Sequence, residues 1–167
     1  MKKKNSYILL LLYCIAFAVQ GQPDDFVRYV NPFIGTAEGM PGKKSMDNAY
    51  TNPGAVLPWG LISISPFNIH DTTNVDAKRP SPYIYGKKYI SGFTHVNMSG
   101  TGCNELGVFC LMPATGDVSP QRACYSEYSD EKASPGYYSV RLDNYRIKAE
   151  VTATLRTSIM VKETHPR

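Results

Sequence analysis

The clearest pattern in the chain is an alternation of apolar and polar residues over positions 147–156. The apolar positions include Ile147, Val151 and Leu155. The polar positions include Lys148, Glu150 and Arg156. Because successive side chains of a strand point to opposite faces of its sheet, this pattern predicts a strand with the first set in the core and the second set exposed.

A second alternating run, residues 138–142, comes just before the first. Asp143 and Asn144 lie between the two runs, and these residue types favour tight turns. The two runs are therefore predicted to form an antiparallel hairpin.

Further strands are predicted upstream. Residues 61–65 alternate isoleucine with serine and stop at Pro66, while residues 106–112 form a continuous apolar run typical of a strand covered on both faces. Cys110 lies in that run and is expected to be a buried structural thiol. Since no window shows a helical apolar stripe, the predicted fold is all-β, an antiparallel β-sandwich, with a long polar loop at residues 71–88.

The N-terminus has the order of a secretory signal peptide. Three lysines precede an apolar run at residues 8–19, and small residues close the segment near Gly21. The run is too short for a membrane-spanning helix, which needs roughly 20 residues. Residues 1–21 are thus expected to be removed, leaving a domain at residues 22–167 that is exported, periplasmic or secreted, with no stable membrane anchor.

Removal of this segment changes the charge balance of the chain. It takes away three lysines and no acids, which leaves 15 basic against 14 acidic residues. A net charge this close to zero gives no reason to expect nucleic acid as a partner. The remaining length suits one domain with its own core.

A series of short blocks resembles the N-terminal domain of glycoside hydrolase family 92, the calcium-dependent exo-α-mannosidases. The resemblance extends from about Tyr29 to Ser158, and it rests on several blocks that occur in the order of the family. The blocks are residues 29–36 (YVNPFIGT), 52–60 (NPGAVLPWG), 63–66 (SISP), 91–103 (SGFTHVNMSGTGC), 111–113 (LMP), 133–138 (ASPGYY) and 149–154 (AEVTAT).

The resemblance implies an exported enzyme that trims α-linked mannose from glycoprotein N-glycans with inversion at the anomeric carbon. It also implies a C-terminal catalytic domain that supplies the acid, the base and most calcium ligands. This sequence has no counterpart of that domain, and residues 160–167 depart from the family's continuation. We therefore expect a fragment without catalytic residues. It should hold no calcium alone, and its partners should be a mannose-containing glycan and the missing domain.

An inverting glycosidase needs two carboxyl groups, roughly 6.5–9.5 Å apart, so the carboxylates of this chain are candidates for such a pair. Most lie in polar, turn-like sequence and are expected to be solvated at the surface, among them Asp130, Glu131, Asp143 and Glu150. Glu105 differs because it follows a glycine-rich loop that leads into the run at residues 106–112. In the family this region faces the cleft between domains, so Glu105, Asp71 and Asp76 are candidates for substrate contact.

Alternation at residues 93–99 places several hydrogen-bonding side chains on one face of a predicted strand end. These side chains suit either sugar hydroxyls or a polar core network. The expected substrate-binding set is His95, Asn97, Ser99, Thr101 and Glu105. Many family members carry a second histidine where this chain has Asn97. Trp59, between Pro58 and Gly60, is expected to pack in the core.

Two other interpretations remain open from the sequence. One is a stand-alone carbohydrate-binding or structural β-sandwich, and the other is a pseudogene product that does not accumulate. The DNA just downstream would discriminate between them and the fragment, since a shifted frame encoding an acidic, helix-rich segment would favour the fragment.

Overall fold

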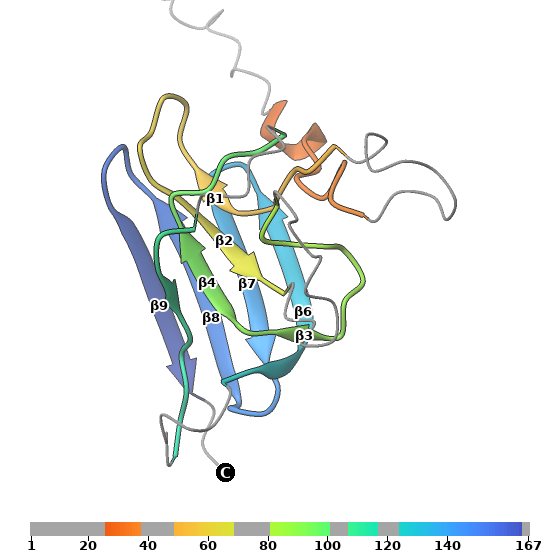
Figure 1. The fold of residues 1–167 in the computed structure, drawn as a ribbon, viewed down its shortest axis with the longest axis vertical. Coiled ribbons are helices and arrows are strands. Elements are labelled where there is room, and N and C mark those ends of the chain that lie inside the picture. The colour runs from red at the N-terminus through yellow and green to blue at the C-terminus, as the bar shows by residue number, and fades with distance from the viewer. Residues whose placement is uncertain (1–25, 38–48, 69–80, 101–106, 117–123, 165–167) are drawn as a thin grey trace, which may run out of the picture.

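The computed structural model of the chain describes residues 26–37, 49–68, 81–100, 107–116 and 124–164 (Figure 1). Two antiparallel sheets lie face to face, which confirms the all-β sandwich. The first sheet has the order β1-β2-β4-β5 and the second has the order β3-β6-β7-β8-β9. The predicted signal peptide lies outside the described residues, and no helix within them is long and apolar enough to cross a membrane.

The regular elements are short in the first sheet and longer in the second. A single 3₁₀ turn, Phe26–Tyr29, precedes the strands of the described chain. The first sheet comprises β1 (Ala55–Val56), β2 (Ser63–Phe67), β4 (Gly92–His95) and β5 (Cys110–Leu111). The second comprises β3 (Tyr89–Ile90), β6 (Ser126–Ser134), β7 (Tyr137–Leu142), β8 (Ile147–Ala153) and β9 (Ser158–Thr164).

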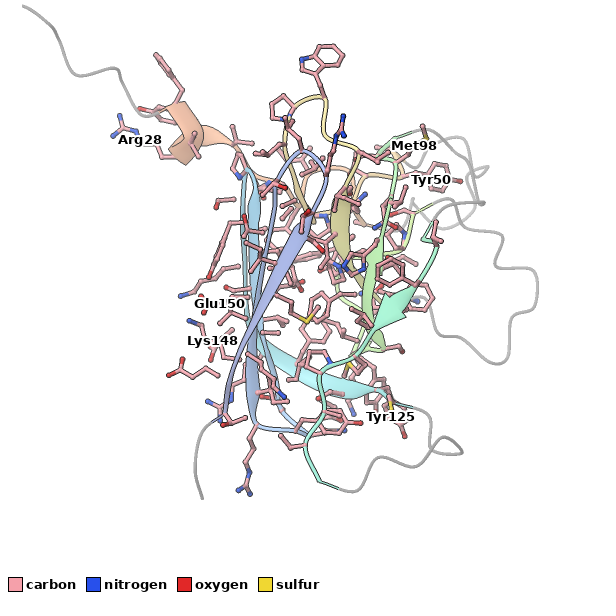
Figure 2. All side chains as sticks on the ribbon, turned by 90° about the vertical axis from the view of Figure 1, so that its left-hand side faces the viewer. Arg28, Tyr50, Met98, Tyr125, Lys148 and Glu150 are labelled. Atoms are coloured by element: carbon pink, nitrogen blue, oxygen red, sulfur yellow. The ribbon has the colours of Figure 1, made fainter. Side chains whose placement is uncertain are left out.

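The predicted hairpin is present as β7 and β8. Leu142 pairs with Ile147 across a four-residue turn, in which Arg146 takes a φ of +55°. The burial of β8 alternates along its whole length: Ile147 and Val151 are buried, whereas Lys148 and Glu150 are partly exposed on the outer side of the sheet (Figure 2). The period-two argument is confirmed for this strand.

The prediction that Leu155 belongs to the core is wrong, because its side chain is 56% exposed. β8 ends at Ala153, and residues 154–157 form the turn into β9. The Thr154 hydroxyl accepts hydrogen bonds from the amides of Arg156 and Thr157. Threonine that bonds to nearby backbone amides in this way competes with the strand ladder, so the chain turns before it reaches Leu155.

Pro66 does not end its strand as predicted, since β2 continues to Phe67. The Phe67 carbonyl accepts a hydrogen bond from the Ser91 amide on the β4 side. Successive residues of a strand direct their backbone groups to opposite sides, so the Pro66 backbone faces away from β4, toward the β1 side. β1 does not extend this far, since its last pair with β2 is at Ile64. Proline is tolerated there because no partner requires its missing N–H.

The predicted buried strand at residues 106–112 is also wrong. β5 has only two residues, Cys110 and Leu111, and both are exposed. β5 is the last strand of its sheet and pairs with β4 alone. Apolar residues that mark a strand in the sequence thus line an open edge, and Cys110 is an exposed free thiol rather than a buried one.

The core lies between the two sheets. Phe93 of β4 meets Tyr138 of β7 edge-on, with ring centroids 6.2 Å apart, and both side chains are fully buried. Further buried residues of this cluster are Ala55, Ile64, Ile90, Val140, Leu142, Ile147, Ala149, Val151 and Ala153.

Candidate functional site

The polar residues at the end of β4 do not form the straight row predicted by alternation. β4 ends at His95, and Val96 takes a φ of +60°. This conformation is uncommon for a β-branched residue, and it turns the chain before Asn97. The strand face therefore ends with His95, and Ser99 is exposed in the segment that follows the turn.

Asn97 connects this turn to the first sheet by hydrogen bonds. Its side-chain amide donates to the carbonyl oxygens of Thr94 (2.8 Å) and Ser63 (3.1 Å), and its Oδ1 accepts from the Thr94 hydroxyl (3.1 Å). Both ends of the amide thus bond to β4 or β2. This is the polar network that the sequence offered as the alternative to sugar contact.

His95 is buried, with 4% of its surface exposed. Its ring stacks on Phe109 at a centroid distance of 4.2 Å and an interplanar angle of 14°. Burial lowers the pKa of the imidazole, which favours the neutral ring. Among the described residues, Nδ1 of His95 finds no hydrogen-bond partner, and a buried polar atom in that state is costly unless something satisfies it.

Thr101 and Glu105 lie outside the described residues, as do Asp71 and Asp76. The structure therefore describes three of the five expected substrate-binding residues, and it places two of them, His95 and Asn97, at the same strand end.

The exposure of Trp59 shows that another prediction is wrong. The side chain is 100% exposed and so does not pack in the core. The residue takes a φ of +61° in the loop between β1 and β2, where Gly60 N donates to Leu57 O at 2.9 Å. This tight turn directs the indole into solvent, where an aromatic face can stack on a ligand or a second protein surface.

Glu131 is the functional group that the sequence reasoning missed. Its two carboxylate oxygens accept hydrogen bonds from different tyrosines, Tyr138 at 2.7 Å and Tyr83 at 3.0 Å. Burial raises the pKa of the Glu131 carboxyl, and the two hydroxyl hydrogen bonds offset only part of that rise. The expectation of a solvated surface carboxylate is therefore wrong for Glu131.

A β-bulge places Glu131 in this position. β6 and β7 change register between Ser129 and Lys132, so that Asp130 and Glu131 both oppose one residue of β7. Asp130 takes a φ of +51° at the same point. A bulge of this kind redirects a side chain relative to regular alternation, and here it directs Glu131 toward the tyrosines. The sequence did hold one clue, because a buried tyrosine such as Tyr138 needs a partner for its hydroxyl.

Other described carboxylates are engaged at the surface. Glu150 accepts from the Tyr137 hydroxyl and pairs with Lys148 at 3.0 Å. Asp143 accepts from the Ser129 hydroxyl at 2.7 Å, and Glu127 pairs with Lys88 at 2.9 Å. These contacts indicate structural roles for Glu150, Asp143 and Glu127.

The described residues do not fit a calcium site. Calcium takes roughly six to eight oxygen ligands, several of them from carboxylates. Within the described ranges, no group of three or more metal-binding side chains is close enough together to hold an ion. Both carboxylate oxygens of Glu131 accept hydrogen bonds from tyrosine hydroxyls, so this group is already engaged by donors rather than by a cation.

The chain matches one protein family over most of its length. The sequence model of the glycosyl hydrolase family 92 N-terminal domain matches residues 29–161. An uncharacterized secreted glycosidase from Arthroderma benhamiae is 29% identical over 158 residues, which is 87% of this chain and 18% of that protein.

Solved structures give the same result. A family GH92 α-mannosidase from Bacteroides thetaiotaomicron is 34% identical, with a TM-score of 0.69 over 84% of this chain and 19% of its own. It has also been solved in complex with mannoimidazole. A second GH92 glycosyl hydrolase is 26% identical, with a TM-score of 0.66 over 83% of this chain and 19% of its own. The chain thus spans about a fifth of the length of these relatives.

Proposed function

Because the chain belongs to the glycosyl hydrolase family 92 N-terminal domain family, we propose that it forms one half of the substrate cleft of an exported α-mannosidase that trims mannose from glycoprotein N-glycans. The observation that carries the proposal is the similarity to the Bacteroides GH92 α-mannosidase, which spans most of this chain. The mannoimidazole complex of that enzyme supports a mannose-like ligand.

The sugar-binding part of the proposal centres on the end of β4. His95, Asn97, Ser99, Thr101 and Glu105 are proposed to line this half of the cleft. The support from geometry is the buried Nδ1 of His95, which has no partner among the described residues. A neutral imidazole can accept or donate one hydrogen bond at that atom, and a sugar hydroxyl would satisfy it.

We further propose that the chain alone does not hydrolyse glycosides. Inversion needs one carboxylic acid to protonate the leaving oxygen and a second carboxylate to activate water. Glu131 has the raised pKa that a general acid requires, yet both of its oxygens are bonded to tyrosine hydroxyls. A second domain would have to supply the catalytic pair and any calcium.

Export completes the proposal. The apolar segment after Lys4 supports a periplasmic or secreted location. The fungal relative is described as secreted, and N-glycans of glycoproteins are substrates met outside the cytoplasm.

The proposal is tested in a chimera in which residues 29–161 replace the equivalent segment of the Bacteroides α-mannosidase. His95→Gln and Glu105→Gln should each lower the rate of mannose release by about tenfold or more, as expected for lost hydrogen bonds to a substrate. Urea unfolding of the same variants reports stability separately.

The matched control is Glu127→Gln, since the Glu127 side chain forms a surface ion pair with Lys88 and such pairs contribute little. This variant should keep the activity of the chimera. If His95→Gln and Glu105→Gln lower stability while the surviving folded enzyme keeps its rate, the two residues are structural and the sugar-binding assignment is wrong.

A further inference from the structure

The ring of Phe109 covers one face of the His95 imidazole. The two ring centroids are 4.2 Å apart and the ring planes differ by 14°, so the rings lie nearly flat on each other. Stacked aromatic rings attract each other beyond the effect of the area that they bury. Phe109 is 49% exposed and does not belong to the hydrophobic core cluster. It therefore contacts the buried imidazole from outside the core.

The backbone at the end of β4 brings the two rings together. β4 pairs with β5, with Thr94 opposite Cys110, and the same register sets His95 opposite Phe109. The His95 amide donates to the Phe109 carbonyl at 3.2 Å, and the His95 carbonyl accepts from the Val108 amide at 3.1 Å. Side chains that lie opposite each other on neighbouring strands interact on one face of the sheet. The stack is therefore held by the strand ladder.

The stack determines the plane of the imidazole. The χ2 torsion of histidine is broad, so the plane of a histidine ring depends on what packs against it. Each ring nitrogen donates or accepts a hydrogen bond in that plane. Nδ1 of His95 is buried and has no partner among the described residues. By fixing the ring plane, Phe109 fixes the directions from which a ligand can reach Nδ1.

Phe109 also affects the protonation of the imidazole. Burial lowers the pKa of His95, and backbone contacts with Phe109 and Phe93 offset part of this effect. A ring that lies on one face of the imidazole contributes to the burial, because it keeps water from that face. A neutral imidazole has one nitrogen that donates and one that accepts, which suits an uncharged hydroxyl group.

We propose that Phe109 is a positioning residue, whose ring holds the His95 imidazole in the plane in which Nδ1 binds a sugar hydroxyl. This inference rests on the proposed function, because it takes the ligand of Nδ1 to be a hydroxyl of a mannose-containing glycan. Phe109 acts through His95 and has no contact with the sugar in this account. The role requires a flat ring, so tyrosine should replace phenylalanine and alanine should not.

NMR titration of the His95 imidazole in the full chain tests the stack without any activity. The His95 signal is identified by its absence from His95→Gln. Phe109→Ala should raise the pKa of His95 toward its ordinary value of about 6.5, because water then reaches the ring. Phe109→Tyr should leave the pKa of His95 as low as in the parent. An unchanged pKa of His95 in Phe109→Ala overturns the proposal.

Leu111→Ala is the matched control for this titration. Leu111 is 50% exposed and lies in β5, but it is opposite Phe93 rather than His95. Its removal should leave the pKa of His95 unchanged, and an equal rise would overturn the assignment to Phe109. If Phe109→Ala does not fold, Phe109→Leu gives the same test, with a smaller rise expected in the same direction.

The chimera with the Bacteroides α-mannosidase tests the role in sugar binding. Phe109→Ala should lower kcat/KM for mannose release by about twofold to tenfold, as expected for one aromatic pair, whereas Phe109→Tyr and Leu111→Ala should keep the parent value. In the His95→Gln chimera, Phe109→Ala should cause no further loss, since it acts through His95.

The outcomes of the two experiments separate this inference from the proposed function. A further loss from Phe109→Ala in the His95→Gln chimera overturns the positioning role, and so does an unchanged kcat/KM in a Phe109→Ala chimera. A parent chimera that releases no mannose counts against the proposed function instead. The NMR titration then still decides whether Phe109 holds and shields the imidazole.

Discussion

Glu131 gives the sharpest prediction about stability, because its carboxylate is the common acceptor for two buried hydroxyls. Tyr138 and Tyr83 are 0% and 1% exposed. Tyr83 also forms a side-chain hydrogen bond with Tyr128, whereas Glu131 is the acceptor that the described residues give to the Tyr138 hydroxyl. Each buried hydroxyl left without a partner costs about 1–3 kcal/mol. Glu131→Ala should therefore lower the free energy of unfolding by about 1–3 kcal/mol, the cost of leaving the Tyr138 hydroxyl without an acceptor.

This loss is measured by urea unfolding of the full chain, followed by circular dichroism. The matched control is Glu150→Ala on the same sheet. Glu150 also accepts from a tyrosine and pairs with Lys148, but at the partly exposed surface, and its removal should cost about 0–1 kcal/mol. If Glu131→Ala costs no more than Glu150→Ala, the hydroxyl contacts seen here do not stabilise the fold.

A double-mutant cycle keeps the test informative if Glu131→Ala unfolds the chain. Tyr138→Phe removes one hydroxyl and keeps the ring that packs on Phe93. In that background Glu131→Ala should cost less than in the parent, with a coupling of about 0.5–3 kcal/mol. Strictly additive losses would show that Tyr138 and Glu131 do not interact.

Three further predictions follow from burial and charge. The pKa of Glu131 is raised in the folded chain, so its contribution to stability is full below its unfolded pKa of about 4.3 and is lost as pH rises through the folded pKa. The free energy of unfolding of Glu131→Gln, minus that of the parent, should accordingly increase as pH rises from the unfolded pKa through the folded pKa of Glu131, and a constant or falling difference would refute the shift. Ile147→Ala should cost about 2–5 kcal/mol in urea unfolding, whereas Leu155→Ala should cost less than about 0.5 kcal/mol, and equal losses would contradict the strand boundary. Trp59→Ser should leave stability within about 0.5 kcal/mol of the parent, and a larger loss would mean that the indole is packed.

Sequence periodicity was a reliable guide where a strand has one buried and one exposed face. β8 follows the alternation from Ile147 to Ala153 because it lies between two partners and packs on the first sheet. The alternating pattern continues to Leu155 in the sequence, but the strand does not, because hydrogen bonds to the Thr154 hydroxyl form a turn there. Alternation reports which face a residue would take, and local side-chain bonds decide where the strand stops.

Other features depend on contacts that no local pattern carries. The apolar run around Cys110 looks like a buried strand, yet its place at a sheet edge leaves it exposed. Glu131 looks like a surface acid, but a bulge directs it toward two tyrosines. Of the candidate cleft residues, His95 and Asn97 do lie at one strand end. They do not lie in the straight row that alternation predicts, because Val96 has a positive φ and turns the chain between them.

Mannose release is the most direct measurement of the central claim that this chain is half of a mannosidase cleft. It should be compared between the purified chain alone and the chimera with the Bacteroides enzyme, each with and without calcium. The proposed function predicts release from the chimera and none from the chain alone. Calcium-dependent release by the chain alone, or a folded chimera that releases no mannose, would contradict it.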